Sequence, residues 1–562
     1  MDFLRGRVVL LVLVLVSACI ATRLPIVDLG YELHQAYSYN ETSGLYNFSN
    51  IRYAAPPVGN LRWRPPVAPT VNRSVVHTGS RGRICPQATP MWETDIAPDF
   101  VVSVIEGVPY TGPTNISSFS YTPGTPDPRT TEDCLFLDIV VPKKIFDRSQ
   151  NKTSVPENAT APVLVWIFGG GYTSGDKSEE SPTGLIERSL KGGKEGIVFV
   201  ALNYRLGAFG WLAGSSLTGN GTANAALYDQ RFALDWVYKN IHLFGGNPNR
   251  VTVMGESAGG GSIEHQITAF GGSRGPAPFQ QAILQSPGWY PVPEQDEQED
   301  TLQEFLGLLN VSTIAQARSL PSSDLIAANA YQVAKTQLYG TFKYGPVVDG
   351  VFAPELPGML LLEGRFDHNL SIMVGHNANE GLAFTPPYSV ESDGLELLIK
   401  SHLPEISANA ENYITNVLYP ANYSGLYGYN TTVGRSALTI GDLVFSCNTD
   451  YLNRAYGNDT YAYMFSIPPA IHGQDVPYTF YTPGVSSASD VESTYIADVM
   501  QDYFTSFVET GVPNSTIGPV FEKYGARGRL LNLGLTNITA MQDPTRNPRC
   551  KWWQKGLYFP HN

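Results

Sequence analysis

The sequence has little charge, few cysteines and no excess of basic residues. Charged side chains make up 16% of its 562 residues and hydrophobic ones 43%, which is typical of a globular chain with ample material for a core. Its 51 acidic residues outnumber its 37 basic ones and give a net charge of −14. Because nucleic acids and anionic membrane surfaces attract basic proteins, neither is expected as a partner.

One apolar run near the N-terminus, Val8–Val16, is too short to span a bilayer comfortably. It follows two arginines and precedes small residues, which is the layout of a cleaved signal peptide. We therefore expect residues 1–21 to be removed during secretion. Val16–Cys19 also loosely resembles a bacterial lipid-attachment site. Residues 558–562 form no hydrophobic tail, so no membrane span or GPI anchor is expected at that end.

Potential N-glycosylation sites favour a eukaryotic secretory protein over the bacterial alternative. Chance gives about 4 or 5 Asn-x-Ser/Thr sequons in a chain of this composition. The fourteen that are present begin at Asn40, Asn47, Asn72, Asn115, Asn151, Asn158, Asn220, Asn310, Asn369, Asn422, Asn430, Asn458, Asn514 and Asn537.

Four of the five cysteines remain once the signal segment is removed: Cys85, Cys134, Cys447 and Cys550. An even number in an oxidising compartment predicts two disulfides, and three pairings are possible. A metal site is a poor interpretation, because no two cysteines are close in sequence and none lies near a spaced pair of histidines. No metal or cofactor is predicted.

The middle of the chain alternates apolar strand-like runs with helical patterns. The helical pattern covers 225–241, and two polar stretches, 109–131 and 149–162, are interpreted as exposed loops within one domain. The predicted strands are 163–168, 197–202, 251–254, 282–284, 372–374 and 461–465. Continuous apolar strands separated by helices predict an α/β fold with a largely parallel sheet covered on both faces.

Two pentapeptides match Gly-x-Ser-x-Gly, centred on Ser257 and Ser273. A nucleophile at such a motif requires a strand before it and a helix after it, so that a tight turn exposes the serine above the sheet. Ser257 follows a strand-like run and precedes small residues suited to close packing. Ser273 follows no such run and is succeeded by two prolines. The context therefore selects Ser257 as the nucleophile and predicts a surface loop at Ser273.

A serine nucleophile needs a base and a carboxylate that orients the base, in the chain order Ser, acid, His for this kind of fold. His472 follows the predicted strand 461–465 and is the expected base. Glu380 follows the strand 372–374 and is the expected acid. The less favoured candidates are His402 as a surface residue, His561 at the terminus, His376 as structural, Asp349 as a turn former and Asp475 as a weak rival acid.

The glycine run Gly169–Gly171 ends the predicted strand 163–168. Glycines allow backbone N–H groups to approach a substrate without a Cβ in the way. We expect the N–H groups of Gly170, Gly171 and Ala258 to stabilise the oxyanion formed during ester cleavage. No Lys-Ser/Thr pair follows the glycines, which argues against phosphate binding.

Together these motifs resemble, in order, the type-B carboxylesterase/lipase family, which includes cholinesterases and many secreted fungal esterases. The resemblance covers nearly all of 22–562 and implies one catalytic domain of the α/β-hydrolase fold. The matching segments are Glu132–Leu137, Asn203–Gly207, Leu227–Arg231, Phe244–Pro248, Gly255–Gly260, Asn379–Gly381 and His472–Gly473.

The resemblance also implies details that the motifs alone do not. It favours pairing Cys85 with Cys134 and Cys447 with Cys550. It places the first of these loops over the active site, where 100–105 could form the apolar face of a lid. Trp92 does not align with the tryptophan that holds cationic substrates in cholinesterases. Ser286 occupies the place of a serine that supports the triad in the family.

The predicted function is a secreted serine carboxylic-ester hydrolase that works through an acyl-enzyme. A lipase acting at lipid interfaces and a dedicated esterase of a secondary-metabolite pathway are the alternatives. A non-catalytic adhesion homologue is the least favoured, because such proteins typically lack the serine that this chain retains.

Overall fold

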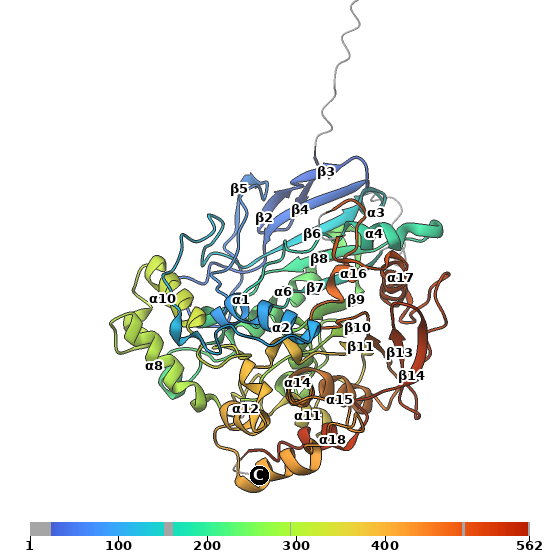
Figure 1. The fold of residues 1–562 in the computed structure, drawn as a ribbon. Coiled ribbons are helices and arrows are strands. Elements are labelled where there is room, and N and C mark those ends of the chain that lie inside the picture. Colours follow the sequence, from blue (N-terminus) through green and yellow to red (C-terminus); the bar gives the residue numbers. More distant parts are fainter. Residues whose placement is uncertain (1–23, 151–160, 293, 486–488, 560–562) are drawn as a thin grey trace, which may run out of the picture.

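The computed structural model describes residues 24–150, 161–292, 294–485 and 489–559. Within these residues a sheet of eleven strands runs through the molecule in the order β14-β13-β12-β11-β10-β9-β7-β8-β6-β4-β3 (Figure 1). The strands are β3 (Ser38–Asn40), β4 (Leu45–Arg52), β6 (Phe136–Pro142), β7 (Ala161–Ile167), β8 (Val198–Leu202), β9 (Gly246–Glu256), β10 (Gln281–Gln285), β11 (Ser371–Asn377), β12 (Tyr461–Phe465), β13 (Arg529–Leu533) and β14 (Ile538–Gln542).

The centre of this sheet, from β8 to β13, is parallel throughout, whereas the pairs at both edges are antiparallel. Every residue of β7 and of β8 is buried, as expected for parallel strands covered on both faces. The prediction of a largely parallel α/β sheet is confirmed. A small second sheet of β1 (Ile26–Asp28), β2 (Glu32–Gln35) and β5 (Asn72–His77) was not predicted.

Two helices connect the central strands closely. The predicted helix 225–241 is α6 (Ala225–Asn240), between β8 and β9. After β9 comes α7 (Ala258–Ile267), all of whose residues are buried. A Cβ on Gly259 would lie 2.1 Å from the carbonyl oxygen of Ile167 in β7, so only glycine lets α7 pack this close to the sheet.

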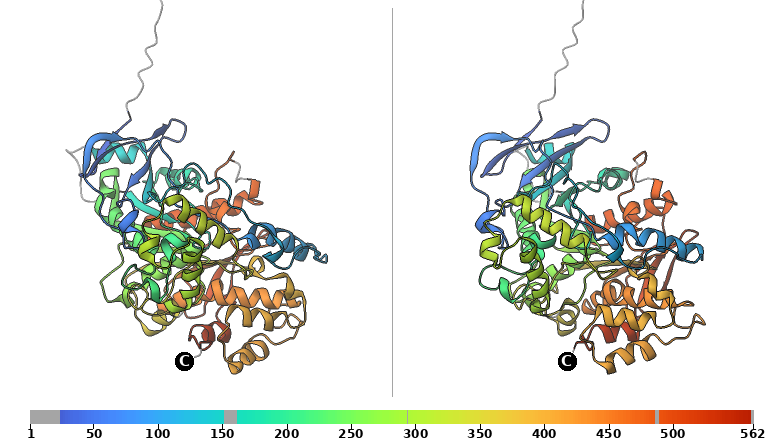
Figure 2. Two further views of the ribbon diagram at one scale, coloured as in Figure 1. Left: turned by 90° about the vertical axis from the view of Figure 1, so that its left-hand side faces the viewer. Right: turned by 60° about the vertical axis from the view of Figure 1, so that its left-hand side comes forward.

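A disulfide between Cys85 and Cys134 closes a segment that contains α1 (Met91–Asp95), α2 (Ala97–Glu106) and the short helix η2 (Ile116–Ser118). In both views of Figure 2, α1 and α2 lie at one edge of the molecule. Phe100 and Val101 pack against Leu382, whereas Val102 and Ile105 are each 50% exposed. The segment thus has both a packed face and an exposed apolar face.

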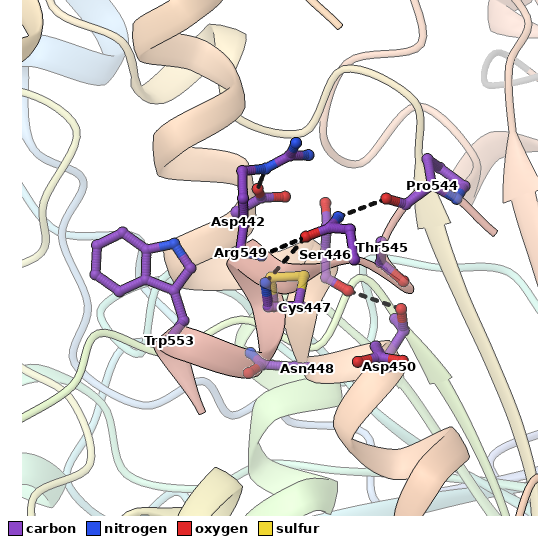
Figure 3. Close-up of a disulfide and its surroundings, with 12 residues drawn as sticks. Asp442, Ser446, Cys447, Asn448, Asp450, Pro544, Thr545, Arg549 and Trp553 are labelled. Atoms are coloured by element: carbon purple, nitrogen blue, oxygen red, sulfur yellow. Dashed lines mark hydrogen bonds and ion pairs between the residues drawn. A yellow bond between two sulfur atoms is a disulfide. The ribbon is translucent and has the colours of Figure 1, made fainter. Parts of the chain in front are cut away.

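The second disulfide joins Cys447 and Cys550, so both pairs are those that the resemblance implied. It links α15 (Cys447–Ala455) to α18 (Pro548–Trp553) at the lower end of the molecule in Figure 1. Beside it, Arg549 Nε donates to Asp442 Oδ2 at 2.7 Å (Figure 3). Asp442 begins η11 (Asp442–Ser446), so the bridge braces the turn that precedes α15.

The remaining helices with at least eight residues lie around the sheet: α3 (Lys143–Gln150), α4 (Thr183–Leu190), α8 (Glu299–Leu308), α10 (Ser322–Ala334), α12 (Gly394–His402), α14 (Thr432–Gly441) and α17 (Thr494–Thr510). In the described part of the chain, no helix has the length and apolarity to cross a membrane. The predicted signal segment 1–21 lies outside the described residues, as do Asn151 and Asn158.

The other twelve sequon asparagines are described. Ten are exposed, and Asn47 and Asn458 are half-buried.

Candidate active site

Ser257 stands between β9 and α7, in the sharp turn that the motif predicts. Its φ of 56° and ψ of −124° lie outside the usual regions for an L-residue, which costs about 1–3 kcal/mol and persists only where the surroundings impose it. The neighbouring strand imposes it here. The Ser257 N–H donates to the Gln285 carbonyl at 3.1 Å, and the Gly288 N–H donates to the Ser257 carbonyl at 3.0 Å.

His472 lies in the loop after β12, with Nε2 2.8 Å from Ser257 Oγ and Nδ1 2.6 Å from Glu380 Oε2. A carboxylate only accepts hydrogen bonds, so Nδ1 carries the proton and donates to Glu380. Nε2 is then left with a lone pair, which accepts from the Ser257 hydroxyl. The hydrogen bonds therefore run from serine to histidine to glutamate.

Glu380 follows β11 and is 2% exposed. Its Oε1 accepts from Ser286 Oγ at 2.6 Å and from the Asn377 N–H at 2.5 Å, while Oε2 accepts from His472. Burial alone raises the pKa of this carboxyl. His472 and the hydrogen bonds outweigh burial and hold the pKa below its usual value. Glu380 is therefore an ionised carboxylate at neutral pH.

A second glutamate, Glu256, precedes Ser257 and is the last residue of β9. Its Oε1 lies 3.4 Å from His472 Nε2 but accepts no hydrogen bond from the described residues. Burial raises the pKa of Glu256 to about 8, with repulsion from Asp475 and Glu380 adding to the effect. Glu256 is thus a buried carboxyl beside the reacting atoms, and its charge is far less favoured than that of Glu380.

The ring of His472 is held by two aromatic side chains. Its centroid lies 4.1 Å from that of Phe445 in η11 and 5.2 Å from that of Phe384, two residues after Leu382. Burial acts to lower the pKa of His472, but Glu256 and Glu380 outweigh it and raise the pKa above its usual value. The histidine is therefore a stronger base than a free imidazole.

The glycine run after β7 turns back beside Ser257. Gly170 and Gly171 have φ of 90° and 57°, a conformation that glycine adopts at little cost. Gly171 and Ala258 line the same cavity as Ser257. The Ala258 N–H is in the first turn of α7, where backbone N–H groups have no acceptor within the helix.

This cavity has a volume of about 50 Å³. Part of its wall is aromatic. The rings that line it belong to Tyr172, Trp289, Tyr290, Phe342, Tyr344 and Phe445.

The rival candidates are placed elsewhere. Ser273 lies in an exposed turn, where its hydroxyl donates to the Phe270 carbonyl. Asp349 forms a turn by accepting from the N–H groups of Val351 and Ala353. Asp475 accepts from Gln285, Asn377 and Tyr463.

One histidine differs from expectation. His402 was expected on the surface, but it is half-buried, its Nδ1 donates to the Leu398 carbonyl, and its ring lies 6.0 Å from that of Tyr290. His376 lies inside β11, which runs three residues beyond the predicted strand 372–374, and it is 3% exposed. His561 is outside the described residues.

Trp92 is 1% exposed and is not a wall of the cavity. Its indole N–H donates to the Thr341 carbonyl at 2.8 Å, and its rings pack against Tyr339, Phe342 and Phe384. This tryptophan connects the segment closed by the first disulfide to the rings around His472. It has no open face to offer a cation.

Sequence reasoning missed Glu256 and the aromatic wall. Glu256 lies inside the Gly-x-Ser-x-Gly motif at the end of a buried strand, and this position could have indicated a buried carboxyl beside the nucleophile. Trp289 and Tyr290 follow β10 closely, and the carboxyl ends of neighbouring parallel strands meet at one edge of the sheet. Phe342 comes from an irregular segment and Phe445 from η11, and neither gave a comparable signal.

Known proteins are similar to this chain over nearly its whole length. The model of the carboxylesterase family matches residues 34–553. Carboxylesterase patB of Aspergillus clavatus is 40% identical over 555 residues, which cover 97% of this chain and 98% of that protein. A secreted lipase of Arthroderma benhamiae is 31% identical and covers 68% of this chain and 72% of its own length.

Among solved structures, EstA of Aspergillus niger superimposes with a TM-score of 0.77 at 25% identity. The match covers 95% of this chain and 98% of EstA. The architecture is accordingly the α/β-hydrolase fold.

Proposed function

The chain belongs to the carboxylesterase family and is a hydrolase of carboxylic esters, and we propose that it works through an acyl-enzyme formed on Ser257. The observation that supports this most is the continuous pair of hydrogen bonds from Ser257 Oγ to His472 Nε2 and from His472 Nδ1 to Glu380 Oε2. This arrangement supplies a nucleophile, a base and an orienting carboxylate in contact with one another.

In the proposed mechanism, His472 Nε2 takes the proton of Ser257 as Oγ attacks the ester carbonyl. Glu380 holds the imidazole in the required tautomer and stabilises the imidazolium. The N–H groups of Gly170, Gly171 and Ala258 stabilise the oxyanion, each contributing about 2.7–4 kcal/mol. His472 then protonates the leaving alcohol, activates a water molecule and restores Ser257 as the acyl group leaves.

Paired serine variants test this assignment. Ser257→Ala should abolish hydrolysis of p-nitrophenyl butyrate, whereas Ser273→Ala, the other motif serine, should leave it intact. Circular dichroism and thermal unfolding establish that both variants are folded. Loss of activity in Ser273→Ala alone would refute the proposal.

We further propose that residues 22–562 form one catalytic domain that is secreted after removal of 1–21 and is N-glycosylated. The sequons support this, since ten of the twelve described asparagines are exposed. N-terminal sequencing and glycopeptide mapping of protein secreted from a eukaryotic host test it. An N-terminus at Met1, or peptides without glycan at all fourteen sequons, would contradict it.

A small-molecule ester is the proposed substrate, because the cavity beside Ser257 has a volume of only about 50 Å³. The similarity to carboxylesterase patB agrees with this. The exposed apolar face of α2 favours lipase action as a second candidate, since Val102 and Ile105 could contact an ester droplet. Rates on p-nitrophenyl acetate and palmitate, each with and without an emulsion, decide between them. A lipase would accelerate at the interface.

A further inference from the structure

Glu264 is a buried carboxyl that the proposed mechanism does not use. It lies in α7, seven residues after Ser257, and none of its surface is exposed. Its Oε2 accepts from the indole N–H of Trp289 at 3.0 Å, and its Oε1 has no hydrogen-bond partner among the described residues. A buried polar group with so little compensation is costly, so a specific role at this position is expected.

Trp289 connects this carboxyl to the active-site cavity. It is 6% exposed and lines the cavity together with Ser257. Its backbone is fixed, because the Tyr172 hydroxyl donates to the Gly288 carbonyl at 2.7 Å and the Trp289 N–H donates to Val444. The bond to Glu264 fixes the far end of the indole.

Glu264 is suited to hold the indole without introducing a charge. Burial raises its pKa to about 8, so the carboxyl is mostly protonated at neutral pH. The neighbouring His265 is also neutral, because burial lowers its pKa to about 4. Its ring packs edge-on against Trp289 with centroids 5.8 Å apart. The indole thus meets two neutral groups from the same helix.

We propose that Glu264 is a specificity-determining positioning residue, which holds Trp289 as a rigid wall of the cavity and thereby limits the ester substituent that enters to a few non-hydrogen atoms. This inference rests on the proposed function of Ser257 and identifies the substrate class of that site as short-chain esters. Without the hydrogen bond, the indole can turn away and admit a longer chain.

The test uses the full chain and two series of esters. One series is p-nitrophenyl acetate to octanoate, which varies the acyl chain, and the other is methyl to octyl acetate, which varies the alcohol. The quantity measured is the ratio of kcat/KM for the short ester to that for the long one. A pocket that rejects extra methylenes gives ratios of about 10–200 per excluded group.

Glu264→Leu should lower this ratio about tenfold in at least one series, with kcat for the shortest ester kept within about threefold. Glu264→Gln retains a carbonyl acceptor for the indole and should keep the wild-type ratio. Trp289→Phe keeps a ring but has no N–H to donate, so it should lower the ratio as Glu264→Leu does. It also serves as a second test if Glu264→Leu does not fold.

Tyr524→Phe is the matched control. It removes another buried hydrogen bond to a carboxyl, from Tyr524 to Asp543 at 2.8 Å, in a part of the chain that does not line the cavity. It should leave the ratio unchanged. Ratios unchanged in both Glu264→Leu and Trp289→Phe, or lowered equally in Tyr524→Phe, would overturn the inference. A wild-type protein inactive on both series would overturn the proposed function instead.

Discussion

Two buried glutamates, Glu380 and Glu256, lie against the same imidazole from the ends of two strands, β11 and β9. They are 2% and 7% exposed, so burial acts on both in the same way. Their pKa values nevertheless move in opposite directions, below the usual value for Glu380 and to about 8 for Glu256. The difference comes from hydrogen-bond donors. Ser286, the Asn377 N–H and His472 donate to Glu380, whereas Glu256 Oε1 receives no hydrogen bond from the described residues.

The contrast shows how a site can assign different roles to identical side chains. A carboxylate with three donors is stabilised as an anion and can orient the imidazole and balance its charge. A carboxyl without donors raises the pKa of the histidine when ionised but does not fix its tautomer. Removing either carboxyl, or the donors of one, should therefore have effects that differ in kind and in size.

The largest effect is expected from Glu380→Gln. The amide of glutamine can donate to His472 Nδ1, which places the proton on Nε2 and removes the lone pair that Ser257 needs. Loss of the orienting carboxylate in a triad typically lowers kcat about 10⁴-fold. We expect a loss of that order, measured with p-nitrophenyl butyrate, and an unfolding temperature close to that of the wild type. A decrease below tenfold would mean that Glu256 can replace Glu380.

A smaller effect is expected from Ser286→Ala, which removes one donor and makes Glu380 more like Glu256. Hydrogen bonds to charged groups contribute about 1.5–3 kcal/mol, so kcat should fall roughly ten- to a hundredfold. Ser286 has φ of 44°, which glycine tolerates better than alanine. Both variants lack the hydroxyl that donates to Glu380, so Ser286→Gly should lose as much activity as Ser286→Ala. If only the alanine variant is impaired, backbone strain and not the hydroxyl is responsible.

Much of this site could be predicted because its residues lie next to regular strands. Ser257, Glu380 and His472 follow β9, β11 and β12, and the apolar runs of these strands are visible in the sequence. The differences between the two glutamates could not be predicted. They depend on the backbone N–H of Asn377, three residues before Glu380, and on Ser286, which follows β10. Only the family resemblance implied a role for Ser286, because no spacing encodes a contact between segments so far apart in sequence.

The same limit explains the errors. His402 belongs to a helix with mixed polarity, which predicted an exposed face. Its ring lies near that of Tyr290, which is more than a hundred residues away in sequence. The antiparallel edges of the sheet were also missed, because short half-exposed strands such as β3 and β14 carry no continuous apolar run. Sequence patterns predicted the buried central strands well, and the edge strands and the contacts between loops poorly.

Glu256→Gln should change the pH dependence more than the maximal rate. His472 must be neutral to act as a base, so activity is present above its pKa and lost as pH falls through it. When it is ionised, Glu256 raises that pKa, and removing the carboxyl should lower the pKa. The acid limb of kcat/KM should then move to lower pH by roughly 1 unit. A limb that stays in place or moves to higher pH would contradict the role of Glu256.

The smallest catalytic effect is expected from Asp475→Asn. Asp475 accepts hydrogen bonds from Gln285, Asn377 and Tyr463, and burial raises its pKa. The raised pKa makes Asp475 less readily ionised, and its carboxyl does not touch the imidazole. The acid limb of kcat/KM should therefore move in the same direction as in Glu256→Gln, but by less. In Asp475→Asn, the side-chain amide has an N–H donor where the carboxylate had an accepting oxygen, so two donors face each other. This should lower the free energy of unfolding by about 1–3 kcal/mol. Urea unfolding and the pH profile measure the two effects separately. A larger shift of the acid limb than in Glu256→Gln would mean that Asp475 affects the pKa of His472 more than Glu256 does. The hydrogen bonds that Asp475 accepts would then not weaken its effect on the imidazole.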